Sequence, residues 1–138
     1  MLEIDVEARS SAPPEKVFAL LADVRTWPEW GDFDRTEVES GEGLGELRIL
    51  HRGRVRNRER VEIFEPPHRF GYESLSGLPI RDYHSLVTLT PQPDTGTHIR
   101  WRSTYRAKVP GTGWLINRTL RRFIADSAER LARAAERA

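Results

Sequence analysis

The chain has 138 residues, which suffices for one domain around a single hydrophobic core. Its 22 basic and 21 acidic residues leave a net charge of +1, so overall charge gives no reason to expect nucleic acid or an anionic membrane as partner. The absence of cysteine excludes disulfides, thiolate zinc sites and a cysteine nucleophile. Without a basic leader or an apolar run of membrane-spanning length, we expect one soluble domain, residues 1–138, in the cytoplasm.

The N-terminal part of the chain predicts a strand followed by two short helices. Apolar and charged residues alternate over 2–9, which is the period of a strand with one buried face. Residues 10–15 supply a serine and two prolines for a helix start, and apolar residues follow at helical spacing as far as Val24. A second helical turn is expected at 27–30, and the glycines of 41–45 lead into a β-rich region.

Two later hairpins have a register that the sequence predicts, because residues paired across antiparallel strands point to the same face. A turn at 91–97 pairs Leu89 with Ile99, Val87 with Trp101, Ser85 with Ser103 and Tyr83 with Tyr105. A turn at 65–68 pairs Ile63 with Phe70, Val61 with Tyr72 and Glu59 with Ser74. Both registers leave several arginines on the opposite face, which is therefore expected to be solvated.

The hairpin at Arg52-Gly53 leaves two registers open. A two-residue turn directs Arg48 and Leu50 inward. A three-residue turn with a bulge instead directs the odd-numbered residues inward, namely Leu47, Ile49 and His51. The inward face of strand 46–51 is therefore undecided.

From 114 the pattern is helical to the end of the chain. One stripe is mainly apolar and consists of Ile116, Leu120, Phe123, Ile124, Ser127 and Leu131, with the arginines mostly off it. A long helix with one apolar face needs a sheet to lie on. The order of one strand, two short helices, about six strands and a final helix predicts an α+β fold.

Four segments that together cover nearly the whole chain carry a resemblance to a known family. They are a strand running into Ala12-Pro13-Pro14-Glu15-Lys16-Val17-Phe18, the segment from Leu21 to Trp30 with Trp27-Pro28-Glu29-Trp30, the segment from Phe64 to Phe70, and the hairpin from Leu89 to Trp101. In these segments the chain resembles the START-like SRPBCC superfamily, and more narrowly its bacterial polyketide cyclase/dehydrase and lipid-transport branch.

The resemblance implies a helix-grip fold, in which a curved antiparallel sheet of about seven strands wraps around the long C-terminal helix. The space between sheet and helix would hold a hydrophobic ligand. Aromatase/cyclases of the superfamily use an arginine and polar groups within this cavity. Whether Arg48 is the equivalent arginine here depends on the undecided register of 46–51.

The inward positions of the predicted strands mix apolar with polar side chains. The apolar members are Val55, Val61, Ile63, Phe70, Val87, Leu89 and Ile99, and the predicted ligand-binding residues are Asn57, Glu59, Tyr72, Tyr83, Ser85, Trp101, Ser103 and Tyr105. A buried polar group without a partner costs about 1–3 kcal/mol, which favours a cavity with a few placed polar groups. The alternative is that these groups hydrogen-bond one another or face water at the open end.

Glu59 is the candidate catalytic residue. Partial desolvation on a concave sheet face favours the protonated carboxyl, which can then act as a general acid or base. The alternative is that Glu59 is ion-paired to Arg48 or lies near the rim.

Three hypotheses for function follow. The leading one is a carrier or sensor that binds a small hydrophobic ligand, lipid or polyketide-like, between the sheet and the final helix. The alternative is an enzyme of the polyketide cyclase/dehydratase type in which Glu59 and an inward tyrosine, Tyr72 or Tyr83, exchange protons. The third is an interaction module that uses the arginine-rich helix, although Asp126, Glu129 and Glu136 interrupt that face.

No metal, cofactor, nucleic-acid or integral membrane association is expected. The four histidines, His51, His68, His84 and His98, lack the close spacing of a metal site. There is no nucleophile elbow, phosphate-binding glycine loop or dinucleotide fingerprint. The identity of the ligand and the oligomeric state are left open.

Overall fold

The computed structural model describes residues 1–138 and consists of one sheet and three α-helices. The strands are β1 (Leu2–Ser10), β2 (Arg35–Ser40), β3 (Leu47–Arg52), β4 (Val55–Glu65), β5 (Arg69–Ser76), β6 (Ile80–Pro91) and β7 (Thr97–Ala107). The helices are α1 (Pro14–Ala22), α2 (Trp27–Trp30) and α3 (Gly113–Arg137), with a 3₁₀ turn, η1, at Val24–Thr26. The expected element order is confirmed.

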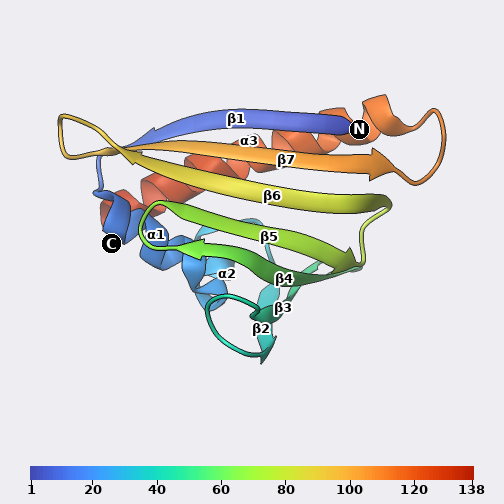
Figure 1. The fold of residues 1–138 in the computed structure, drawn as a ribbon, viewed down its shortest axis with the longest axis horizontal. Helices are drawn as coiled ribbons and strands as arrows, with labels where there is room; N and C mark the ends of the chain where they lie inside the picture. The colour runs from blue at the N-terminus through green and yellow to red at the C-terminus, as the bar shows by residue number, and fades with distance from the viewer.

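The seven strands form one antiparallel sheet in the order β1-β7-β6-β5-β4-β3-β2. Figure 1 shows the long helix α3 running along β1 and β7, and α1 lying near the C-terminus. This is the predicted α+β helix-grip arrangement, with α3 held against one face of the sheet.

The two halves of α3 meet the sheet differently. The second half buries small residues, Ala128, Ala132 and Ala135, which let the helix approach the sheet closely. The Ser10 hydroxyl also donates a hydrogen bond of 2.8 Å to the carbonyl oxygen of Ala132. The first half carries larger apolar residues that remain partly exposed. None of the helices is long and apolar enough to span a membrane.

The β6–β7 register is confirmed for most of its length. Val87 pairs with Trp101, and the pairs on either side of it also match the prediction. The ladder is irregular between Arg81 and His84, and Asp82 has a positive φ of 51°. Tyr83 is therefore not in a regular pair with Tyr105, although both side chains are buried with ring centroids 6.4 Å apart.

The β4–β5 register is only partly as predicted. Val61 pairs with Tyr72 and Glu59 with Ser74, as expected. The predicted pairing of Ile63 with Phe70 is wrong, because an extra residue between Val61 and Ile63 inverts the alternation that follows. Phe64 therefore pairs with Phe70 and packs on the core, and Ile63 leaves the core face.

The open register of the β3–β4 hairpin is decided by its turn. Arg52 pairs with Val55, so the turn has two residues, and Gly53 has the positive φ of 60° that its first position requires in a type II′ turn. Arg48 and Leu50 consequently face inward, with Arg48 directly opposite Glu59. The alternative, with Ile49 and His51 inward, is excluded.

Candidate functional site

A cavity of about 740 Å³ lies between the sheet and α3. Of its 24 lining residues 15 are hydrophobic. The sheet contributes Leu50, Arg52, Val55, Asn57, Glu59, Tyr72, Ile80, Tyr83 and Trp101, whereas α3 contributes Leu115, Ile116, Thr119, Leu120, Arg122, Phe123, Ile124, Asp126 and Ser127. The volume and the mainly apolar wall are typical of a site for a small organic ligand.

The structure brings five of the eight predicted ligand-binding residues to the cavity wall: Asn57, Glu59, Tyr72, Tyr83 and Trp101. Ser85, Ser103 and Tyr105 are buried but lie outside the lining. The Ser85 and Ser103 hydroxyls are 2.6 Å apart and hydrogen-bond each other, as the alternative interpretation expected of some inward groups. A role in ligand binding stays a prediction for all eight.

The predicted apolar lining is mostly packed core. Only Val55 of that set lines the cavity. Val61, Phe70, Val87, Leu89 and Ile99 are buried in the core cluster, and Ile63 is not part of it. Facing inward therefore does not imply facing the cavity, because side chains near α1 and the second half of α3 meet other side chains.

The Glu59 carboxylate, in the cavity wall, is held by two donors, of which Asn57 also lines the cavity and Arg48 does not. Arg48 Nε lies 3.3 Å from Glu59 Oε1, and Asn57 Nδ2 donates to Glu59 Oε2 at 2.7 Å. The Ser74 hydroxyl donates to Asn57 Oδ1 at 2.6 Å, which fixes the amide. Burial raises the pKa of Glu59, and the Arg48 charge offsets this only in part.

Arg48 is fully buried behind this wall and is surrounded by aromatic rings. Its Cζ lies 4.5 Å from the ring centroid of Trp27, 5.0 Å from that of Phe70 and 5.4 Å from that of Tyr72. These faces stabilise the cation where water is excluded. Nη1 and Nη2 of Arg48 have no hydrogen-bond partner. The guanidinium therefore keeps free donors next to Trp27 and Tyr72, which line the cavity.

Two tyrosines, Tyr72 and Tyr83, line the cavity, and the Tyr83 hydroxyl lies 3.4 Å from the hydroxyl of Ser103, which is outside the lining. Burial raises the pKa of Tyr72 well above its ordinary value and also raises that of Tyr83. Both phenols therefore stay protonated at neutral pH. They can donate hydrogen bonds to a ligand oxygen, and they are poor bases.

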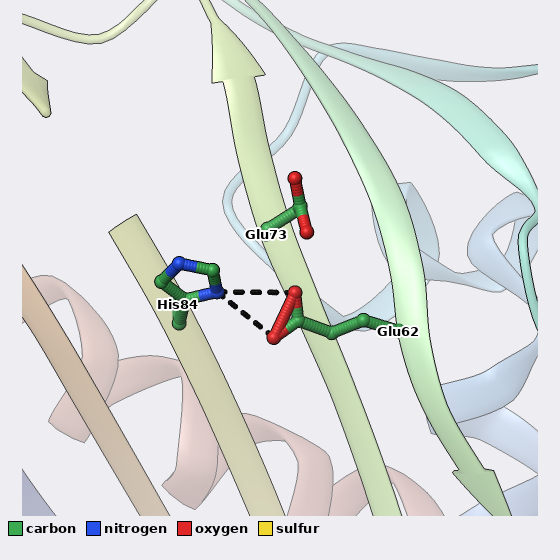
Figure 2. A group of neighbouring side chains, drawn as sticks. All are labelled: Glu62, Glu73 and His84. Atoms are coloured by element: carbon green, nitrogen blue, oxygen red, sulfur yellow. Dashed lines mark hydrogen bonds and ion pairs between the residues drawn. The ribbon is translucent and has the colours of Figure 1, made fainter. Parts of the chain in front are cut away.

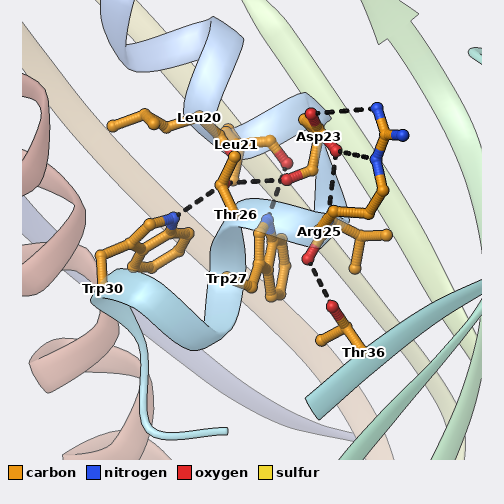
Figure 3. A network of polar contacts seen from close by, with 9 residues as sticks. Leu20, Leu21, Asp23, Arg25, Thr26, Trp27, Trp30 and Thr36 are labelled. Carbon is orange, nitrogen blue, oxygen red and sulfur yellow. Dashed lines mark hydrogen bonds and ion pairs between the residues drawn. The ribbon is translucent and has the colours of Figure 1, made fainter. Parts of the chain in front are cut away.

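A network of polar contacts fixes the two indoles at the α2 end of the cavity (Figure 3). Trp27 Nε1 donates to the carbonyl oxygen of Leu21 at 3.0 Å, and Trp30 Nε1 donates to the Thr26 hydroxyl oxygen at 3.2 Å. The Thr26 hydroxyl in turn lies 2.8 Å from the Leu20 carbonyl oxygen. With their polar edges satisfied, Trp27 and Trp30 present their ring surfaces to the cavity.

Sequence reasoning placed the cavity between the sheet and the final helix, but it named no ligand-binding residue on α3 or at the α2 end. The stripe of α3 was expected to lie on the sheet, yet Ile116, Leu120 and Phe123 line the cavity. One signal in the sequence distinguishes the two halves: the buried positions of the second half include three alanines, whereas the first half has larger residues. The large apolar residues on the first half of α3 reach toward the sheet across the cavity, where alanines would not reach.

Metal-ligand residue types also come together on the opposite face of the sheet. Figure 2 shows Glu62, Glu73 and His84 on β4, β5 and β6, with their ligand atoms within 4.8 Å of one another. His84 Nδ1 lies 2.8 Å from Glu62 Oε1, and Arg60 donates to Glu73 Oε1 at 3.0 Å. Each group thus already has a partner, and we assign the cluster to the ion-pair network of this outer face.

The fold and the cavity define a START-like helix-grip protein. Residues 1–136 match the family described as polyketide cyclase / dehydrase and lipid transport, and the chain belongs to this family. No curated protein matches the sequence.

Solved structures agree with this fold. A START superfamily protein of Mycobacterium smegmatis superposes with a TM-score of 0.85 at 11% identity, covering 98% of this chain and 97% of that one. The XoxI protein of Bacillus cereus gives 0.84 at 17% identity, with 97% and 95% covered. A protein of Thermus thermophilus gives 0.74 at 24% identity, with 99% and 95% covered. At these identities the similarity concerns the fold alone.

Proposed function

We propose that this protein is a carrier or sensor that binds a small hydrophobic ligand, lipid or polyketide-like, in the cavity between the sheet and α3. The observation that carries the proposal is the cavity of about 740 Å³ with its mainly hydrophobic wall. Apolar ligand surface buried there contributes roughly 25 cal/mol per Å². Membership of a family described by lipid transport supports the same conclusion.

The polar groups in the wall favour a ligand with at least one oxygen. The neutral phenols of Tyr72 and Tyr83 are able to donate hydrogen bonds, and Asn57 lies beside Glu59 on the same strand. All four side chains come from β4, β5 and β6, opposite the apolar residues of α3. A ligand would therefore lie with its polar end toward the sheet and its apolar part along the helix.

The test is displacement of an apolar fluorescent probe by a panel of fatty acids, sterols and aromatic polyketides. Leu120→Trp places a larger ring in the cavity and should weaken probe binding at least tenfold. Ala125→Trp adds the same ring on the exposed side of α3 and is the matched control, expected to bind as wild type. The proposal would be overturned if wild-type protein failed to bind the probe, or if the two variants bound it equally well.

A second candidate function is proton-transfer catalysis in the same cavity, of the polyketide cyclase/dehydratase type. It is favoured by one observation, a cavity-lining carboxyl, Glu59, whose pKa is raised by burial toward the range of a general acid. Once a ligand that turns over is found, Glu59→Gln should abolish turnover while ligand affinity stays within about threefold. Unchanged turnover would remove Glu59 from the mechanism.

A further inference from the structure

One end of the molecule exposes large apolar side chains next to the cavity. Val109 is 59% exposed, Trp114 69% and Leu115 52%, and all three lie in the β7–α3 connection or the first turn of α3. Leu115 also lines the cavity, so this surface adjoins the cavity wall. Clustered exposed apolar residues of this size on a monomer mark an interaction surface.

The same segment is uniformly basic. Residues 106–122 hold five basic residues, Arg106, Lys108, Arg118, Arg121 and Arg122, and no Asp or Glu. The acidic residues that interrupt the arginine face of α3 begin only at Asp126. The local charge is thus strongly positive although the whole chain carries only +1.

Four of these five basic side chains differ from most arginines farther along α3 because they lack an ion-pair partner. Arg130 is paired with Asp126 at 2.6 Å and Arg133 with Glu129 at 3.3 Å. In the basic segment only Arg106 has such a partner, Asp82 at 3.6 Å. Lys108, Arg118, Arg121 and Arg122 form no ion pair. Arg121 donates to the carbonyl oxygen of Glu3 at 3.5 Å, and the charges of Lys108, Arg118 and Arg122 are free to meet an external anion.

The helical spacing places the two kinds of side chain on one face. Trp114, Arg118 and Arg122 follow each other at intervals of four residues, and Leu115 flanks them. A tryptophan with an adjoining row of arginines suits the boundary between lipid headgroups and acyl chains, where the ring enters and the cations stay at the anionic surface. We define Lys108, Val109, Trp114, Leu115, Arg118 and Arg122 as the docking patch.

We propose that the docking patch binds peripherally to the surface of an anionic lipid bilayer, with the cavity opening beside the membrane. Entry of a lipid from the membrane into the cavity rests on the proposed function. Docking of the protein on the membrane does not depend on it. Unpaired cations favour an anionic surface, and the exposed tryptophan favours a bilayer over a nucleic acid, because the patch offers a single aromatic ring for base stacking.

Binding is measured by co-sedimentation of the tag-free protein with phosphatidylcholine vesicles that contain or lack 30% phosphatidylglycerol. Anionic vesicles should bind at least tenfold more tightly, and 0.5 M NaCl should remove most of that gain. Trp114 is the reporter, because Trp27, Trp30 and Trp101 are buried: its emission should shift to the blue on binding, and Trp114→Phe should lose the shift.

Variants separate docking from ligand binding. Trp114→Ala and Arg118→Gln change residues outside the cavity lining and should each weaken vesicle binding about fivefold or more while probe binding stays at the wild-type level. Arg130→Gln, at a paired arginine of the same helix, is the control and should bind vesicles as wild type. Equal binding to neutral and anionic vesicles, binding that the patch variants do not weaken, or tighter binding to duplex DNA than to vesicles would each overturn the proposal. If wild-type protein bound vesicles but not the probe, the carrier function would be overturned and membrane docking would stand.

Discussion

At the scale of single residues, the pair of Arg48 and Glu59 is the most constrained feature of the interior. Both side chains are nearly or fully buried, and one contact of 3.3 Å joins them. Removing two charges from water is costly, and a single long contact compensates it poorly. The aromatic rings around Arg48 stabilise its cation, whereas Glu59 faces a cavity, and burial raises its pKa.

The raised pKa of Glu59 predicts how stability changes with pH. A carboxyl whose folded pKa lies above its unfolded value of about 4.5 contributes stability below that pH and loses it as the pH rises through the folded pKa. The free energy of unfolding of wild type, relative to Glu59→Gln, should therefore fall from pH 4.5 upward. Urea unfolding at several pH values measures this difference. If the difference rises with pH instead, Arg48 holds the carboxylate ionised and the pKa of Glu59 is lowered, not raised.

At the scale of elements, turns and bulges decide which side chains reach the cavity. The two-residue turn at Gly53 directs Arg48 inward, and the irregularity between Val61 and Ile63 places Phe64 on the core. The β5–β6 turn is tightly seated: Gly77 has a φ of 105°, and a Cβ there would lie 2.0 Å from the carbonyl oxygen of Arg56. This turn leads directly into Leu78, Pro79 and Ile80, which line the cavity.

The close approach at Gly77 predicts a large effect of one methyl group. Gly77→Ala combines an unfavourable positive φ, worth about 1–2 kcal/mol, with a backbone clash worth roughly 1–3 kcal/mol more. Gly111→Ala is the matched control, because Gly111 has a φ of 84° and nothing within 4 Å of the added Cβ. Urea unfolding of both variants compares the two losses. Equal losses would mean that the strand at Arg56 moves away at no cost.

At the scale of the whole molecule, the two halves of α3 pack differently against the sheet. The second half of α3 closes on β1 through alanines, and the first half stands over the cavity with partly exposed apolar residues. A cavity of about 740 Å³ leaves many apolar side chains without packing partners. A ligand that fills the cavity supplies these packing partners and should therefore stabilise the folded protein.

Ligand binding is accordingly expected to raise the melting temperature. A ligand at a concentration of one hundred times Kd contributes about 2.7 kcal/mol, which for a chain of this size corresponds to roughly 8–10 °C in Tm. Thermal unfolding followed by circular dichroism at increasing ligand concentration measures the shift. Binding at any site of the folded protein raises Tm, so a compound that displaces the probe and leaves Tm unchanged would not be a ligand of the folded protein.

The sequence by itself determined the features that depend on local pattern. The alternation of residues 2–9 determined β1, and the pairing of Val87 with Trp101 followed from the period of two on either side of a turn. The apolar stripe determined that α3 turns one face toward the sheet, and the resemblance of four segments identified the family. These signals are local, since each is carried by residues close to one another along the chain.

Only the tertiary structure decided which inward residues meet a cavity and which meet other side chains. An extra residue in β4 moved Ile63 off the core, and no local pattern shows such a bulge. Ser85 and Ser103 face inward as predicted but hydrogen-bond each other outside the lining, whereas Glu59 lines the cavity and Tyr83 both lines it and contacts Ser103. The physical reason is the distance between sheet and helix: it is set by small residues at one end of α3 and large ones at the other, and becomes apparent only when strands and helix are assembled.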